Sequence, residues 1–275
     1  MEYFELYNGV KVPVLGAGTF PLKRFELIKI VRNATQLGYT LFDSAAAYYN
    51  EKALGYAWRL TFKKRENLFL ISKLSNRQQR AGDVHKACME SLEKMRTKYL
   101  DMYLMHWPNP DTYIDCWKQM EELYEKGLVK SIGVCNFHQH HLEELMKHAK
   151  IKPMVNEIEV HPLLSQEPLI DYCKEQGIQV IAYSPLARMH EKLIKNEILV
   201  EIAKHKNKSV VQVILRWDFQ RDLITIPKSS SKERLKMNMD IFDFSLTEEE
   251  MEAIRGINED FRVRHNPDNC DFSKL

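Results

Sequence analysis

The sequence predicts an α/β protein that forms a single (β/α)₈ TIM barrel over residues 1–275, with an N-terminal β-hairpin and two extra helices. Three observations lead to this fold. Short apolar segments alternate with amphipathic ones, the apolar segments number eight, and glycine separates several amphipathic segments from the next apolar one. Strands that alternate with helices are parallel and are joined by right-handed crossovers. Eight such units in 275 residues favour a closed barrel over an open doubly wound sheet.

The hairpin comes first and is expected over residues 6–15, because Asn8-Gly9 is a strong signal for a two-residue turn. The barrel strands follow, separated by the predicted helices. Each is a short apolar run, which is typical of a strand that is buried on both faces. The eight predicted strands are residues 14–17, 39–42, 68–72, 100–105, 129–134, 155–159, 179–183 and 223–226.

Two helices are predicted in addition to the eight that follow the strands. Residues 198–205 and 210–220 both show helical periodicity between the seventh and eighth strands, so the first of them is an inserted helix. The second extra helix begins after Thr247, which forms a capping box with Glu250. The polar tail, residues 262–275, is expected to be extended. We find no linker and no sequence repeat, and therefore predict one domain.

Composition excludes several classes of function. The chain is 44% hydrophobic and 28% charged, as is typical of a globular protein, and its net charge of +2 favours neither nucleic acid nor an anionic membrane as a partner. Its five cysteines are far apart and form no CxxC pair, so we expect neither a disulfide framework nor a zinc ribbon. The N-terminus does not resemble a signal peptide, and no apolar run reaches 18 residues. We expect a cytoplasmic protein.

Polar side chains follow nearly every predicted strand. Catalytic residues of (β/α)₈ barrels gather at the C-terminal ends of the strands, so these side chains are candidates for a common site. Any barrel has polar loops, which accounts for the serines and asparagines. It accounts less well for an Asp, a Lys and a His on three successive strands, because such groups need partners. The residues are Asp43, Lys73, His106, Asn136, Glu157, Tyr183, Ser184, Lys228, Ser229 and Ser230.

Residues 38–51 suggest a reaction. Alone, they are equally typical of a helix-capping Asp43 followed by two loop tyrosines. With Lys73 nearby, Tyr48 becomes a candidate proton donor, because an ammonium stabilises the phenolate and lowers the pKa of the phenol. Asp43 would hold that ammonium, and His106 would orient a substrate oxygen. A proton donor aimed at a carbonyl oxygen is half of a reduction, and the hydride has to come from a cofactor.

Several motifs carry a resemblance to a known family. Gly38–Glu51 matches the pattern G-[FY]-x-x-[FI]-D-[ST]-A-x-x-Y-x-N-E, and further matches follow in order along the chain. Through them the chain resembles the aldo-keto reductase superfamily, and its compact loops resemble prokaryotic members such as 2,5-diketo-D-gluconate reductase. The resemblance implies a barrel that binds NADPH, with Asp43, Tyr48, Lys73 and His106 as the catalytic tetrad. The further matches are Ile71-Ser-Lys73, Leu104-Met-His-Trp-Pro108, Gly133-Val-Cys-Asn-Phe137, Val155-Asn-Glu-Ile-Glu-Val-His-Pro162, Tyr183-Ser-Pro-Leu186 and Ile226-Pro-Lys-Ser-Ser230.

The same resemblance assigns the cofactor contacts. The segment around Ser230 would bind the adenosine 2′-phosphate, so NADPH should bind and NADH should bind more weakly. The alternative interpretation of this segment is a solvated helix start. Gly16-x-Gly18 is a poor dinucleotide fingerprint, because the third glycine is missing. The resemblance implies that the 2′-phosphate is bound by Lys228, Ser229 and Arg234, and that the adenine is contacted by Asn238. It implies that Tyr183 stacks on the nicotinamide and that Asn136 and Glu157 bind the nicotinamide carboxamide. Ser184 and Leu186 would line the path of the pyrophosphate.

Three residues depart from the family's pattern near this cofactor site. Glu157 stands where Gln is usual, Cys135 where Ser is common, and Met237 where some members have Glu. A carboxylate accepts hydrogen bonds but cannot donate one unless it is protonated, so Glu157 changes what the carboxamide can bond. We expect these changes to alter cofactor affinity more than the tetrad.

Phe20, Tyr49 and Trp107 are predicted to line the substrate pocket, with core packing as the alternative. His138, His140 and His141 raise the possibility of a metal-dependent hydrolase, but adjacent histidines at a helix start are typical of a solvated surface, so we predict no metal. A second alternative is a sensor or regulatory subunit that binds NADPH with little turnover; the complete tetrad argues against it. We expect a monomer that acts on small carbonyl compounds.

Overall fold

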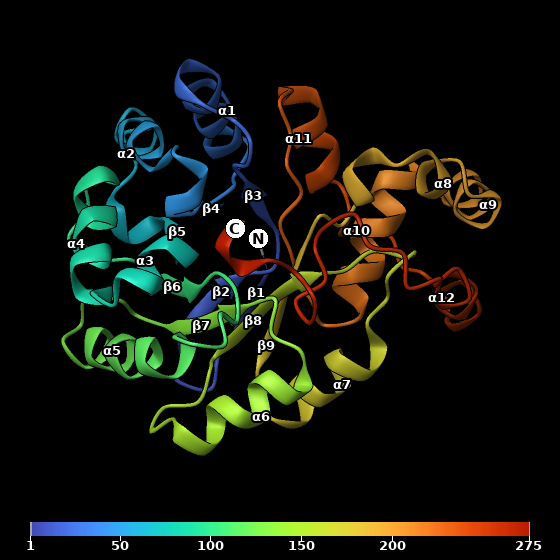
Figure 1. The fold of residues 1–275 in the computed structure, drawn as a ribbon. Coiled ribbons are helices and arrows are strands. Elements are labelled where there is room, and N and C mark those ends of the chain that lie inside the picture. Colours follow the sequence, from blue (N-terminus) through green and yellow to red (C-terminus); the bar gives the residue numbers. More distant parts are fainter. Residues whose placement is uncertain (1, 275) are drawn as a thin grey trace.

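Eight parallel strands form the centre of the protein in the computed structural model, which describes residues 2–274 (Figure 1). Each strand pairs with the next one along the chain, from β3 to β10. The barrel closes through parallel bridges from Leu15 to Thr225 and from Gly18 to Lys228. The predicted (β/α)₈ barrel is confirmed. The strands are β3 Gly16–Gly18, β4 Leu41–Asp43, β5 Phe69–Leu74, β6 Met102–Met105, β7 Ile132–Cys135, β8 Val155–Glu159, β9 Gln179–Tyr183 and β10 Ile224–Thr225.

A ring of helices surrounds these strands (Figure 1). Both extra helices that the sequence predicts are present, α9 between β9 and β10 and α12 near the end of the chain. The capping box of Thr247 and Glu250 opens α12. The short helices α3 Asn76–Ala81 and α8 Glu191–Ile194 were not predicted, because so few residues show no clear periodicity. The others are α1 Arg24–Gln36, α2 Glu51–Arg59, α4 Val84–Lys94, α5 Tyr113–Glu125, α6 Gln139–His148, α7 Glu167–Glu175, α9 Glu197–Lys206, α10 Val210–Gln220, α11 Lys232–Met239 and α12 Glu248–Arg255.

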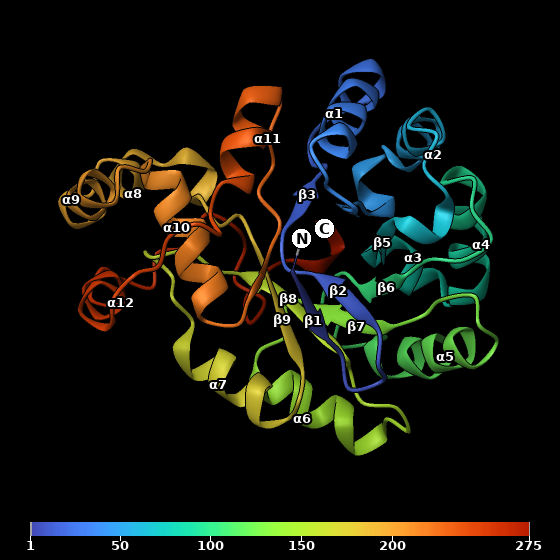
Figure 2. The same ribbon diagram turned by 180° about the vertical axis from the view of Figure 1, so that it is seen from behind.

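The N-terminal hairpin lies at the end of the barrel where the strands begin (Figure 2). It pairs β1 Tyr3–Glu5 with β2 Lys11–Pro13. The predicted span and its two-residue turn are wrong, because residues 6–10 form the loop and Leu6 N–H donates to Val10 O over 2.9 Å. Asn8 in this loop donates to the carbonyl of Lys130, which precedes β7. The hairpin therefore covers the end of the barrel where the strands begin.

The C-terminal tail crosses the opposite end of the barrel, where the strands finish. Buried Glu159, the last residue of β8, accepts hydrogen bonds from the backbone N–H groups of Val263 (2.6 Å) and Arg264 (3.0 Å). The tail is extended as predicted, apart from a turn at residues 267–269 and a 3₁₀ turn at Phe272–Lys274. No helix within residues 2–274 is both long and apolar enough to cross a membrane.

Candidate active site

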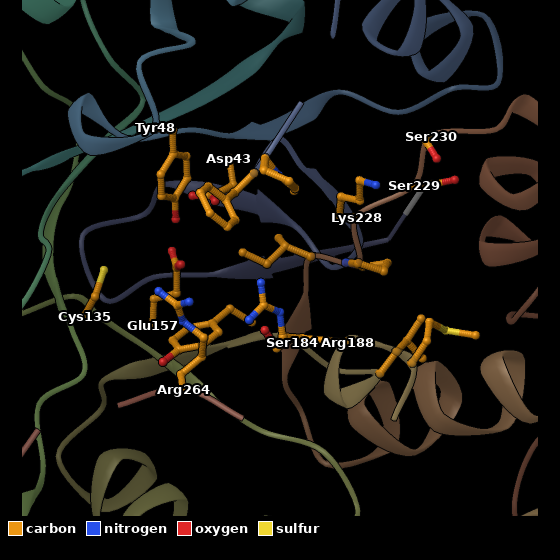
Figure 3. Close-up of a pocket in the computed structure, with 18 of the residues that line it drawn as sticks. Asp43, Tyr48, Cys135, Glu157, Ser184, Arg188, Lys228, Ser229, Ser230 and Arg264 are labelled. Carbon is orange, nitrogen blue, oxygen red and sulfur yellow. The ribbon is translucent and has the colours of Figure 1, made fainter. Parts of the chain in front are cut away.

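A cavity of about 570 Å³ opens at the C-terminal end of the barrel (Figure 3). The structure brings nearly all of the predicted site residues to its wall, although they come from seven different strands, the loops after them and helix α11. Two do not line it: Lys73, which lies behind Asp43, and Tyr49. Those that do are Phe20, Asp43, Tyr48, His106, Trp107, Asn136, Glu157, Tyr183, Ser184, Leu186, Lys228, Ser229, Ser230, Arg234 and Asn238.

Lys73 is completely buried and connects the charged groups at one end of the cavity. Its Nζ donates to a carboxylate oxygen of Asp43 and to the carbonyl of Ser44 at 3.1 Å, and it lies 3.3 Å from Glu157 Oε1. Burial lowers the pKa of Lys73, but Asp43 and Glu157 outweigh burial and hold the pKa well above its ordinary value. The ammonium is therefore a fixed positive charge under the cavity.

Tyr48 lies directly above this charge, on a 3₁₀ turn that follows β4. Lys73 Nζ is 5.3 Å from the centroid of the Tyr48 ring, and the His106 ring lies 5.7 Å away. Burial raises the pKa of the Tyr48 phenol, and Lys73 offsets only part of that rise. The prediction that Lys73 brings this pKa below its ordinary value is therefore wrong. The phenol therefore keeps its proton at neutral pH.

Asn50 holds the Tyr48 loop in place. It is buried, and its Oδ1 accepts from Ser44 Oγ at 2.7 Å. Its Nδ2 donates to the carbonyls of Thr19 (3.2 Å) and Leu22 (3.0 Å), which follow β3. The turn that carries the phenol is thus tied to two neighbouring strands.

His106 follows β6 and is neutral. Burial, Lys73 and Arg264 lower its pKa to about 3. Its carbonyl accepts from Asn136 Nδ2 at 3.0 Å, and the Oδ1 of the same amide accepts from the Tyr183 hydroxyl at 2.6 Å. This chain of contacts aligns the ends of β6, β7 and β9, and a neutral imidazole can donate to a substrate oxygen without adding charge.

Glu157 retains a proton at neutral pH. Burial and the nearby charge of Asp43 raise its pKa to about 8, against a smaller opposing effect of Lys73. Burial also raises the pKa of Asp43, while Lys73 lowers it. Because Lys73 lies closer to Asp43, we assign the charge to Asp43 and the proton to Glu157. A protonated carboxyl can donate as an amide does, and Glu157 Oε2 is buried without a partner among the described residues.

Tyr49 is not part of the cavity, contrary to the prediction. Its backbone is left-handed, with φ of 55°, and its side chain is 81% exposed. The turn that places Tyr48 inward therefore directs its neighbour outward. Trp107 and the partly exposed Phe20 do line the cavity, and the Phe20 ring packs 5.0 Å from Tyr48.

The far end of the cavity carries positive charge. Figure 3 shows Lys228, Ser229 and Ser230 on the side opposite Tyr48. Arg234 Nη2 donates to Ser230 Oγ at 2.9 Å, and its backbone N–H is capped by Ser231 at the start of α11. Two cations beside a helix N-terminus and serine hydroxyls suit an anion such as a phosphate.

The residues that line the cavity and that sequence reasoning missed include Arg188, Met189 and Arg264. Ala187, Arg188 and Met189 follow β9 and all have positive φ, a conformation that their side chains do not signal in sequence. Arg264 belongs to the tail, whose position depends on a contact with β8 more than 100 residues earlier in the chain.

The histidine cluster lies outside the cavity. His138 Nδ1 pairs with the carboxylate of Asp268 at 2.8 Å, which joins the tail to the start of α6. The rings of the adjacent residues His140 and His141 lie close together, with centroids 3.9 Å apart. Both lie near Asp268.

Comparison with known proteins places this chain in a family. Residues 14–259 match the model of the aldo/keto reductase family, and the chain belongs to that family. It is 48% identical over 269 residues to the glyoxal reductase of Bacillus subtilis, covering 98% of this chain and 97% of that protein. It is 37% identical over 270 residues to a methylglyoxal reductase of Escherichia coli strain K12, covering 96% of each.

Solved structures show the same architecture. An aldo-keto reductase from a Medee basin deep-sea metagenome library matches with a TM-score of 0.95 and 39% identity, over 98% of this chain and 99% of that one. A Bombyx mori aldo-keto reductase in complex with NADP matches with a TM-score of 0.91 and 34% identity, over 97% and 96% of the two chains. The narrower likeness to 2,5-diketo-D-gluconate reductase stays a prediction.

Proposed function

We propose that this chain reduces aldehydes and ketones to alcohols with NADPH as the cofactor, and that Tyr48 protonates the carbonyl oxygen. The observation that carries the proposal is one cavity with two different ends. Tyr48, Lys73, Asp43 and His106 gather at one end, and the cations around Ser230 at the other. Relatives named glyoxal reductase and methylglyoxal reductase, and a neighbour solved with NADP, support it.

The residues present fit this cofactor. The unpartnered Oε2 of Glu157 is a buried polar atom at the cavity wall, where a carboxamide could bond it. Asn136 would bind the same group and Tyr183 would stack on the ring. When bound, NADPH supplies the hydride from nicotinamide C4. Lys228, Ser229, Ser230 and Arg234 would hold the 2′-phosphate, Asn238 the adenine, and Ser184 and Leu186 the pyrophosphate.

The chain's own residues would handle the proton. His106 is neutral and donates to the carbonyl oxygen, which orients the substrate toward Tyr48. Tyr48 then transfers its hydroxyl proton to that oxygen, and the fixed charge of Lys73 stabilises the phenolate that remains. Asp43 keeps Lys73 charged and in position.

Tyr48→Phe tests this proposal. It removes the proton donor and keeps the ring that packs against Phe20, so we expect NADPH oxidation with an aldehyde to fall by roughly 10²–10⁴-fold. NADPH binding, measured by quenching of protein fluorescence, should be unchanged. The exposed neighbour provides a matched control, Tyr49→Phe, which should turn over normally.

Two outcomes would contradict the proposal. Near-wild-type turnover by Tyr48→Phe would exclude the phenol as the donor. Tight NADPH binding by the unmodified protein without oxidation by any aldehyde or ketone of a broad panel would instead favour a sensor or regulatory subunit.

A further inference from the structure

Arg264 places a positive charge at the catalytic end of the cavity, apart from the cations at the far end. Figure 3 shows its guanidinium on the side of Tyr48 and Glu157, away from Lys228. Its guanidinium carbon lies 6.0 Å from the centroid of the Phe20 ring. Together with burial and Lys73, it lowers the pKa of His106. Arg264 therefore lies beside the groups that would surround a substrate.

The Arg264 side chain has no hydrogen-bond or ion-pair partner in the described chain. Its hydrogen bond to Glu159, at 3.0 Å, is made by the backbone N–H. That bond holds the residue over the cavity, while the guanidinium points inward without an ion pair among residues 2–274. An arginine used only to fasten the tail would bond the barrel with its side chain, as Arg262 does with Gln166.

We propose that Arg264 binds a carboxylate of the substrate, so that this reductase prefers carbonyl compounds that also carry an acidic group. The inference rests on the proposed function and adds the substrate class. A planar guanidinium offers two parallel N–H donors, which match the two oxygens of a carboxylate. The face of the Phe20 ring beside it reduces the screening of that attraction by water.

The test compares pairs of aldehydes that differ in charge. Succinic semialdehyde is paired with pentanal, and 4-carboxybenzaldehyde with methyl 4-formylbenzoate, in which the acid is masked as an ester. For the unmodified protein, kcat/KM should be higher for the acid of each pair. In Arg264→Met this preference should fall by roughly ten- to a hundred-fold, as expected for the loss of one charge-assisted contact.

Arg262→Met is the matched control, because Arg262 lies in the same tail but bonds His138 and Gln166 outside the cavity. It should leave the preference for the acid unchanged. Arg264→Lys, which keeps the charge and loses the two-donor geometry, should restore part of the preference.

Three results would overturn the inference. The first is equal losses for the acid and its neutral partner in Arg264→Met. The second is a fall in NADPH affinity that accounts for the whole loss, because Arg264 would then serve the cofactor. The third is turnover of both members of each pair at equal rates by the unmodified protein, which would leave the proposed function intact. A lack of turnover of any aldehyde would instead reject the proposed function itself.

Discussion

Glu157 shows how one side chain can change the electrostatics of a catalytic site. It shares Lys73 with Asp43, so two carboxyl groups compete for one ammonium in a buried space. Burial, which has the larger effect, and the charge of Asp43 together raise the pKa of Glu157 to about 8. Below this pH the group is neutral, and above it a second negative charge lies near Tyr48. That charge would oppose formation of the phenolate.

We therefore predict that the reduction rate falls as the pH rises through about 8, and that Glu157→Gln removes this fall. The pKa of Glu157 is higher in the folded protein than in the unfolded chain. Between pH 4.5 and about 8, Glu157 therefore holds a proton in the folded protein that the unfolded chain has lost. Stability should decline with rising pH across that window, and Glu157→Gln should gain roughly 1–4 kcal/mol at its upper end. Profiles of kcat and of thermal denaturation against pH measure both effects. Identical profiles for the two proteins would show that Glu157 does not titrate there.

Among individual residues, the sequence predicts some members of the site correctly and assigns others wrongly. Asp43, Lys73 and His106 could be predicted because strand residues have fixed directions, and the ends of parallel strands share one edge. Tyr48 and Tyr49 are adjacent and chemically alike, so only the left-handed backbone at Tyr49 separates a residue in the cavity from one in solvent. The pKa of Tyr48 also depends on the burial of its phenol, which no motif reports.

At the scale of elements, the start of α11 combines several weak anion-binding features. Ser231 caps the helix, Arg234 lies in its first turn, and the loop before it carries Lys228 next to the closing bridge with Gly18. Each feature alone is typical of a solvated helix start. Their combination beside the cavity is what supports a phosphate site.

Arg234→Ala should weaken NADPH binding by about 1–3 kcal/mol and affect NADH much less, since only NADPH has the 2′-phosphate. Dissociation constants for both cofactors, measured by fluorescence titration, test this difference. Lys232→Ala is the control, because that lysine lies in the same helical turn but contacts Gln36 outside the cavity. Equal losses for NADPH and NADH in Arg234→Ala would contradict the 2′-phosphate assignment.

At the scale of the whole molecule, the tail completes the site from outside the barrel. Glu159 is buried and accepts two tail N–H groups and a contact from His161 Nε2 at 3.0 Å. No local pattern in the sequence reports this attachment, which explains why Arg264 was missed. The single domain and the monomeric state stay predictions.

Glu159→Gln should loosen the tail, because an amide cannot accept through both of its terminal atoms and leaves a tail N–H unpaired. We expect a loss of about 1–3 kcal/mol in stability and faster hydrogen exchange in residues 262–271 than in the unmodified protein. Mass spectrometry of deuterated peptides measures the exchange. The exposed Glu143→Gln serves as the control, and unchanged protection of the tail in Glu159→Gln would rule out this anchoring role.

The bridge between Gly18 and Lys228 has a consequence for synthesis on the ribosome. Domains emerge from the N-terminus onward, and the strand that completes this barrel emerges only near the end. Until then, β3 and β9 have unpaired edges, which are prone to pair with other chains. A chain interrupted before residue 224 would lack both the closure and the anion-binding end of the cavity, so incomplete products should aggregate rather than accumulate as partly active reductase.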